Sequence, residues 1–225
     1  MKLLLLAILL CPITVSAQHT FKVQNPAGTI NVAIEIEKCE EGRSCRGASK
    51  FAFSRRGQDE PFQVINLPDT IMWLDDDKPQ VNRTLLYDEQ SVMTFDDFNF
   101  DGLEDVAICD GNNGAYGMPS YQVYLYSKAE GRFTNNAAFT KLGQEYLGMF
   151  EVDPKRKRLS TLTKSGCCWH QAAEYIVVNN VPKMVLEITD DATYTGQGGD
   201  KVKVTTRRLV KGRWQTSVKY VKRED

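Results

Sequence analysis

Apolar and polar residues alternate along much of this chain. Residues Asn31 to Glu37 read NVAIEIE, and residues Tyr121 to Tyr126 read YQVYLY, with aromatic residues at both parities. A period of two places successive side chains on opposite faces of a β-strand. Both segments are therefore predicted to be strands.

Other alternating segments occur in pairs separated by short turn sequences. Asn179-Asn180, Lys211-Gly212 and Asp153-Pro154 each stand between two such segments. The pairs are Ala173 to Val178 with Val181 to Ile188, Lys201 to Val210 with Arg213 to Val221, and Phe150 to Val152 with Leu159 to Thr163. The pattern predicts an all-β protein, either β-propeller-like or a sandwich-like stack of antiparallel hairpins.

Two regions bear on this architecture in other ways. No long segment has a helical period, so no long helix is expected. Residues Glu60 to Asp77 are less regular and are expected to form a loop that includes the acidic run Asp75-Asp76-Asp77. The stretch DFNFDGLED does not recur in the chain, so a regular multi-blade propeller is not predicted.

The first 17 residues have the features of a secretory signal peptide. Lys2 supplies the positive start, Leu3 to Leu10 is apolar throughout, and Val15-Ser16-Ala17 offers short residues to a signal peptidase. The apolar run is too short to span a membrane. Cleavage after Ala17 would leave residues 18–225, which fit a single all-β domain without a membrane anchor.

The charges of the whole chain nearly cancel, with 28 basic and 29 acidic residues. No overall field would draw such a chain to nucleic acid or to a membrane. Acidic residues gather between Asp96 and Asp110, and basic residues gather in Pro154 to Arg158 and in Lys201 to Arg223. These groups are expected to be solvated turns and outward strand faces.

Five cysteines would remain after signal cleavage. Cys39 and Cys45 enclose a glycine-containing bend and are predicted to form a short-loop disulfide in an oxidising compartment. Adjacent Cys167 and Cys168 could bridge each other, or one of them could pair with Cys109 or with the N-terminal pair. The odd count leaves one thiol over, and Cys109 in the apolar stretch VAIC is expected to be that buried thiol.

The segment DFNFDGLED, residues 97–105, places oxygen donors at alternate positions and a glycine at the bend. Donors spaced in this way can converge on one Ca²⁺ ion, a hard cation that prefers oxygen ligands. An EF-hand loop would need a glutamate where Ile108 stands, and the residues after the loop read as a strand. The loop is therefore similar to those of FG-GAP-type propeller blades, with a metal-free Asx-rich turn as the alternative. The predicted Ca²⁺ ligands are Asp97, Asn99, Asp101, the carbonyl of Leu103, and Asp105.

The next segment, Asp110 to Tyr121, reads DGNNGAYGMPSY and is predicted to be a long, irregular hairpin loop. Tyr116 lies near its tip, and an exposed aromatic residue on a loop anchored at its base can serve recognition. The alternative is an inert glycine-rich connection in which Tyr121 begins the buried face of a strand. The candidate partner-binding residues are Gly114, Tyr116, Ser120 and Tyr121.

A third segment, SGCCWH, contains two cysteines and His170. A catalytic thiol is disfavoured here, because a disulfide-bonded sulfur is not a nucleophile. No GxSxG, HExxH or phosphate-loop motif is present in the sequence. The chain is therefore not expected to be an enzyme.

Taken together, DFNFDGLEDVAICDGNNGAYGMPSYQVYLY, SGCCWH and the tyrosine-containing strand after it resemble a known family. Its members are periplasmic, calcium-binding, β-propeller-like immunity proteins that inhibit lysozyme-like antibacterial toxins of type IV secretion systems, and they are grouped with periplasmic lysozyme inhibitors. The resemblance covers about Val92 to Tyr175, under half of the chain.

The resemblance implies a calcium-stabilised inhibitory loop in a periplasmic protein. The family's loop carries a glycine and a tyrosine at the spacing of Gly114 and Tyr121 in this sequence. The implied partner is a cognate secreted toxin, a peptidoglycan hydrolase, with no nucleic acid involved. The alternative is a calcium-dependent, FG-GAP-like envelope or adhesion module without a toxin partner.

Overall fold

The computed structural model describes residues 19–24, 28–40, 42–84, 90–193 and 200–222. The predicted signal peptide, residues 1–17, lies outside these ranges. The described residues form three sheets whose paired strands are all antiparallel, in the manner of an all-β sandwich. This confirms the all-β prediction. Within the described ranges, no helix is long and apolar enough to span a bilayer.

The N-terminal sheet has the strand order β1-β2-β3-β5-β6, and β4 also pairs with β3. Its apolar side chains alternate with polar ones along β2, as the sequence predicts, and Val32, Ile34 and Ile36 are fully buried. The strands are β1 (His19–Gln24), β2 (Ile30–Glu40), β3 (Ser44–Arg55), β4 (Pro61–Leu67), β5 (Ile71–Asp75) and β6 (Lys78–Pro79).

The middle sheet has the order β10-β9-β8-β7 and carries the two loops of interest. The aspartate-rich segment, residues 97–104, joins β7 to β8, and the Gly114-containing loop joins β8 to β9 through the short 3-10 turn η1 (Ala115–Gly117). The strands are β7 (Met93–Asp96), β8 (Asp105–Cys109), β9 (Tyr121–Ser127) and β10 (Arg132–Asn135).

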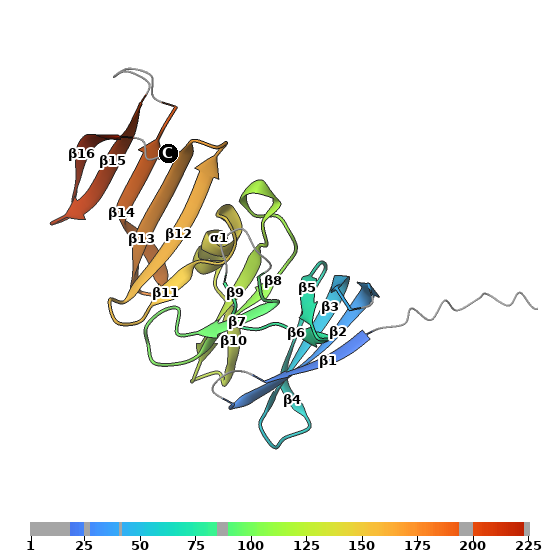
Figure 1. Ribbon diagram of the computed structural model, residues 1–225. Coiled ribbons are helices and arrows are strands. Elements are labelled where there is room, and N and C mark those ends of the chain that lie inside the picture. The colour runs from blue at the N-terminus through green and yellow to red at the C-terminus, as the bar shows by residue number, and fades with distance from the viewer. Residues whose placement is uncertain (1–18, 25–27, 41, 85–89, 194–199, 223–225) are drawn as a thin grey trace, which may run out of the picture.

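The C-terminal sheet follows chain order from β11 to β16, and it contains the three hairpins that the sequence predicts. β15 and β16 form the edge of this sheet that lies farthest from the N-terminal sheet (Figure 1). The strands are β11 (Glu151–Asp153), β12 (Arg158–Ser165), β13 (Trp169–Val178), β14 (Val181–Asp191), β15 (Lys201–Val210) and β16 (Arg213–Lys222).

The middle sheet lies between the other two and contributes to two hydrophobic cores (Figure 1). Successive side chains of a strand point to opposite faces. In β8, Val106 and Ile108 belong to the core shared with the N-terminal sheet, whereas Ala107 and Cys109 belong to the core shared with the C-terminal sheet. All five residues of β8 are buried. Both faces of this strand are therefore covered, which fixes the position of the two loops at its ends.

One α-helix was not foreseen in the sequence. Helix α1 (Ala137–Glu145) packs against β9 and places Phe139 and Leu142 in the second core. It is capped by Asn136, whose side-chain oxygen accepts hydrogen bonds from the backbone N–H groups of Ala138 and Phe139. With nine residues it spans about two and a half turns, too few to produce a clear helical period.

The expectation that residues Glu60 to Asp77 form a loop is wrong. The segment contains β4 and β5, which both pair with β3. Ile65 and Leu67 of β4 alternate into the first core. The turn between the two strands contains Pro68 and Asp69, residues that interrupt the alternating pattern without ending the sheet.

Candidate functional site

The aspartate-rich loop is attached to the sandwich at its last acidic residue. Asp105 is fully buried at the start of β8, and its two carboxylate oxygens accept hydrogen bonds from Tyr126 N (2.8 Å) and Phe98 N (3.0 Å). These bonds tie the loop both to β9 and to its own beginning. The pKa of Asp105 is raised to about 7, chiefly by burial and in smaller part by the nearby carboxylates of Asp101 and Asp97, while the two backbone hydrogen bonds act to lower it.

Inside the loop, the acidic side chains fold back onto the backbone. Asp97 accepts hydrogen bonds from Asp101 N (2.9 Å) and Gly102 N (2.8 Å). Asp101 in turn accepts one from Leu103 N (2.8 Å). Gly102 has φ of 87°, a conformation that suits glycine, so the bend falls where the sequence predicts it.

The apolar residues of this loop face the protein, as their alternation with the polar residues requires. Phe98 is fully buried in the second core, where its ring meets Phe150 edge-on at 5.3 Å between centroids. Phe100 is partly buried against the same core. Asp97, Asn99 and Asp101 are at least partly exposed, so an ion could approach them from solvent, whereas Asp105 is buried.

The chemistry of these donors suits a calcium ion. Each carboxylate oxygen that accepts one N–H retains a second lone pair for a cation. The loop supplies three carboxylates, an amide oxygen and the carbonyl of Leu103, all of which are hard oxygen donors. In the described part of the chain, however, no three Asp, Glu, His or Cys side chains already converge as a metal site. The carboxylate side chains would have to turn toward the centre of the loop as the ion binds.

The next loop, residues 110–120, is called the Tyr116 loop below. Its C-terminal end differs from the prediction, because Ser120 and the first residue of β9, Tyr121, are both fully buried. Ser120 Oγ donates to Gly111 O (3.1 Å), and Tyr121 Oη donates to Ser91 O (2.7 Å). Neither side chain can touch a partner in this conformation. Tyr121 instead begins the buried face of β9, the alternative that the sequence left open.

Gly114 and Tyr116 occupy the outer part of the loop. A Cβ atom at Gly114 would lie 2.8 Å from Met118 O and 3.0 Å from both Pro119 O and Tyr146 O, so close backbone packing requires glycine there. Tyr116 is 59% exposed and has a positive φ of 58°. The candidate contact residue of the loop is therefore Tyr116, which is exposed while the loop around Gly114 is tightly packed.

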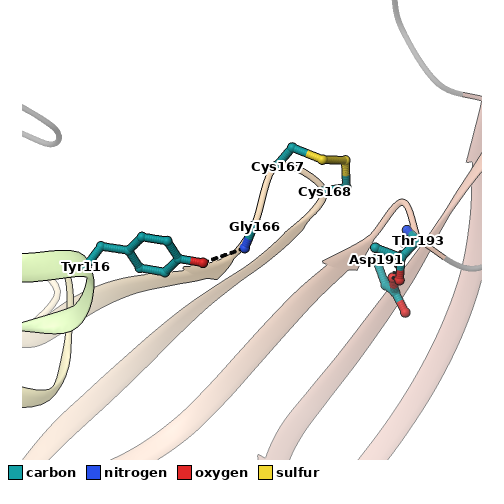
Figure 2. Close-up of a disulfide and its surroundings, with 6 residues drawn as sticks. All are labelled: Tyr116, Gly166, Cys167, Cys168, Asp191 and Thr193. Carbon is teal, nitrogen blue, oxygen red and sulfur yellow. Dashed lines mark hydrogen bonds between the residues drawn. A yellow bond between two sulfur atoms is a disulfide. The ribbon is translucent and has the colours of Figure 1, made fainter.

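Tyr116 reaches across to the turn between β12 and β13. Its hydroxyl oxygen accepts a hydrogen bond from Gly166 N, and Lys164 Nζ lies 5.0 Å from the centre of its ring. Figure 2 shows the tyrosine directed at Gly166, directly beside the Cys167–Cys168 disulfide. We call residues Ser165 to Cys168 the disulfide turn. It is exposed from Ser165 to Cys167 and forms one surface with Tyr116.

The disulfide turn is also connected to the neighbouring end of β14. Ala192 N donates to Cys168 O (2.7 Å), and Asp191 Oδ1 accepts from Thr193 N (3.0 Å) in the adjacent turn (Figure 2). These bonds link the support of Tyr116 to the C-terminal sheet. Tyr116 is thus placed both by its own loop in the middle sheet and by the C-terminal sheet.

The cysteines follow one of the arrangements considered from the sequence. Cys39 and Cys45 are bonded, which confirms that pairing, and Cys167 bonds with its neighbour Cys168. Cys109 is the free, buried cysteine that was expected. Burial raises the pKa of its thiol to about 11, which leaves it a poor nucleophile at neutral pH.

The sequence indicated the Tyr116 loop and the SGCC segment as candidates, but it did not predict that the two segments contact each other. The two segments are about 50 residues apart, and nothing in either one specifies the other. The available signal was the joint occurrence of both segments in the family resemblance. Lys164, which lies against the tyrosine ring, carries no sequence signal of its own.

These features define an all-β protein of three antiparallel sheets with an aspartate-rich loop and an exposed, supported tyrosine. No protein-family model matches the chain, and no curated protein has a matching sequence. Among solved structures, it is similar to a Xanthomonas protein described as related to a type IV secretion system. The TM-score is 0.67 over 92% of this chain and 96% of that chain, at 20% sequence identity. A likeness at this identity shows a shared fold.

Proposed function

We propose that this protein is a periplasmic immunity protein, not an enzyme, that binds and inhibits a secreted peptidoglycan-degrading toxin. The observation that carries the proposal is the exposed ring of Tyr116, held on a supported loop beside the disulfide turn. A pre-ordered loop binds a partner without the full entropy cost of ordering on contact. The fold shared with a protein related to a type IV secretion system supports the same context.

The chemistry of tyrosine suits insertion into the cleft of a hydrolase. Its ring buries apolar area while its hydroxyl forms hydrogen bonds at the rim. Glycosidase clefts hold paired carboxylates, which a hydroxyl or a lysine ammonium could engage. Lys164 stands over the Tyr116 ring and would present its positive charge at the same place.

Calcium would stabilise this arrangement indirectly, from the aspartate-rich loop at the opposite end of β8. The ligands would be Asp97, Asn99, Asp101, the Leu103 carbonyl and Asp105. Asp105 is bonded to Tyr126 on β9, the strand that starts directly after the Tyr116 loop. An ion bound there would neutralise the repulsion among the carboxylates and fix the start of β8, the strand whose other end leads into the Tyr116 loop.

The disulfide arrangement fits an oxidising compartment such as the periplasm. It also argues against the thiol-enzyme alternative, because the sulfurs of Cys167 and Cys168 are bonded to each other. The proposal therefore assigns these cysteines to the support of the loop.

The test is inhibition of the cognate hydrolase, captured from the producing bacterium with the purified protein and then assayed on peptidoglycan. Tyr116→Ala should weaken inhibition by about 2 kcal/mol, roughly thirtyfold, as expected for a central interface tyrosine. Tyr220→Ala is the matched control, because it removes another exposed tyrosine, on the edge strand β16 of the C-terminal sheet. Equal inhibition by both variants and wild type would exclude Tyr116 as the anchor. Binding to cell envelopes without any hydrolase inhibition would favour the FG-GAP-like module instead.

A further inference from the structure

The C-terminal hairpin, residues Lys201 to Lys222, has a composition unlike the rest of the chain. It contains eight lysine and arginine residues and no aspartate or glutamate. The whole chain has a formal net charge of −1, so the remainder carries an acidic excess. We call this segment the basic hairpin. Its positive charge is local, although the total charge of the protein is close to zero.

The basic hairpin also carries most of the large apolar side chains that stand out from the described surface. Every residue of β16 is exposed. Four of the seven large hydrophobic residues with high exposure lie on this one strand, at 41–45% each. They are Trp214, Val218, Tyr220 and Val221. Isolated apolar residues on a surface are ordinary, but such a concentration on one strand marks an interaction surface.

Apolar and basic groups occur together on both faces of the hairpin. Strand alternation and register place Trp214, Val218 and Tyr220 on one face, together with Lys203 and Arg207 of β15. Val202, Val204 and Val221 lie on the other face with Lys219, and these valines border a hollow of ≈ 560 Å³ beside the disulfide turn. Within the described chain, no residue of β16 belongs to either hydrophobic core.

Arg207 of β15 contacts the side chain of Trp214, near the start of β16. Its guanidinium lies 5.1 Å from the centre of the Trp214 ring and donates a hydrogen bond to Glu187 Oε1 (3.0 Å). One face of the indole is therefore covered by a cation. The other side of the ring, on an exposed strand, is presented outward next to the turn residues Lys211 and Gly212.

We propose that the basic hairpin binds the surface of an anionic phospholipid bilayer. Tryptophan and tyrosine prefer the boundary between headgroups and acyl chains, and lysine and arginine are attracted to anionic headgroups. A protein partner docking on one face would leave the apolar residues of the other face exposed. A headgroup layer can surround both faces of an edge strand, which fits the exposure of all ten residues of β16. This binding would be peripheral and reversible, distinct from a membrane-spanning anchor.

The test uses the full mature protein with two kinds of vesicle, phosphatidylcholine alone and phosphatidylcholine mixed with phosphatidylglycerol. Flotation should recover the protein with the phosphatidylglycerol vesicles at about 0.15 M salt and much less at about 1 M salt, where charges are screened. Tryptophan emission should shift to shorter wavelength on binding. Trp214→Phe should remove most of that shift, because Trp73 and Trp169 lie outside the hairpin.

Replacement of the charges identifies the surface that binds. The triple variant Lys211→Gln, Arg213→Gln, Lys219→Gln should lose roughly a hundredfold in vesicle affinity. The matched control is Lys155→Gln, Lys157→Gln, Arg158→Gln, which removes the same charge from the basic β11–β12 turn and the first residue of β12 and should keep vesicle affinity. Inhibition of the hydrolase should be unchanged in both, which separates this inference from the proposed function. If the triple variant does not fold, Lys219→Gln alone should still show a several-fold loss.

Three results would overturn the inference. Absence of binding to phosphatidylglycerol vesicles by the wild type is the first. An equal loss in the β11–β12 control would show that only net charge matters. Binding to soluble polyglutamate but not to vesicles would assign the hairpin to an acidic protein segment instead of a bilayer.

Discussion

At the scale of single residues, two tyrosines of one short segment lie in opposite environments. One is available for contact with a partner, and the other supports the fold. Tyr116 is exposed, whereas Tyr121 is fully buried with its hydroxyl bonded to Ser91 O. The hydroxyl of Tyr116 meets Gly166 N on a different sheet. A substitution at either position could reduce inhibition, but for different physical reasons.

The buried tyrosine should therefore affect stability first. Tyr121→Ala should lower the free energy of unfolding by about 3–5 kcal/mol, because it leaves a cavity in the second core. Tyr121→Phe should cost about 1 kcal/mol, since it removes one buried hydrogen bond. Urea denaturation measures both. Tyr116→Ala is the comparison and should change stability by about 0.5 kcal/mol or less, as for an exposed side chain. A Tyr121→Ala protein as stable as wild type would contradict the burial.

Single-residue roles were only partly predictable from the sequence. The parity of Tyr121 with Val123 and Leu125 indicated a buried strand position, but the family spacing pointed to a contact residue. Ser120 is buried with its hydroxyl bonded to Gly111 O, in a loop whose sequence has no repeating pattern. Irregular loops have no period from which to infer which side chains point inward.

At the scale of elements, the aspartate-rich loop and β8 form one unit. Asp105 is both the last predicted ligand and the first residue of the fully buried strand. An ion in the loop would thus be coupled directly to strand pairing. Ligands that bind only the folded state raise its stability by mass action.

The calcium prediction follows from this coupling. At a calcium concentration about a hundredfold above Kd, the free energy of unfolding should rise by about 2.7 kcal/mol. Thermal melting with calcium and with a chelator measures the difference, and Asp101→Ala should abolish it. Asp76→Ala, in the exposed turn after β5, is the matched control and should keep the shift. A wild-type melting temperature that is the same with calcium and with a chelator would contradict the calcium prediction.

Elements with a clear alternation were predicted well, and the others were not. The hairpins of the C-terminal sheet and the strand at Asn31 to Glu37 appear close to their expected bounds because alternating segments bounded by clear turn residues define them. Helix α1 was missed because it is short, and β4 and β5 because a proline-containing turn interrupts their alternation. The pairing of β3 with both β4 and β5 is a tertiary fact that local sequence does not encode.

At the scale of the whole molecule, the two cores are joined through the middle sheet. In β8, Ile108 packs in the core shared with the N-terminal sheet, and Ala107 packs in the core shared with the C-terminal sheet. Neither outer sheet can lose its packing without exposing one face of this strand. The order of three sheets also places the Tyr116 loop and the basic hairpin at different parts of the molecule (Figure 1).

This arrangement predicts that residues 18–225 unfold as one domain. Urea denaturation followed by tryptophan fluorescence and by far-ultraviolet circular dichroism should give coincident transitions. Trp73 lies in the N-terminal sheet, whereas Trp169 and Trp214 lie in the C-terminal sheet, so fluorescence samples both ends. Two separate transitions would show that the cores fold independently and that the chain has two domains.

The most direct test of the proposed inhibition is site-specific photo-crosslinking to the hydrolase. A benzophenone amino acid at position 116 should crosslink to peptides that line the catalytic cleft, as mass spectrometry would identify, and substrate that fills the cleft should compete. The same probe at position 220 should give no crosslink to that cleft. Inhibition that persists with no crosslink from position 116, or with crosslinks only to surfaces remote from the cleft, would contradict the account.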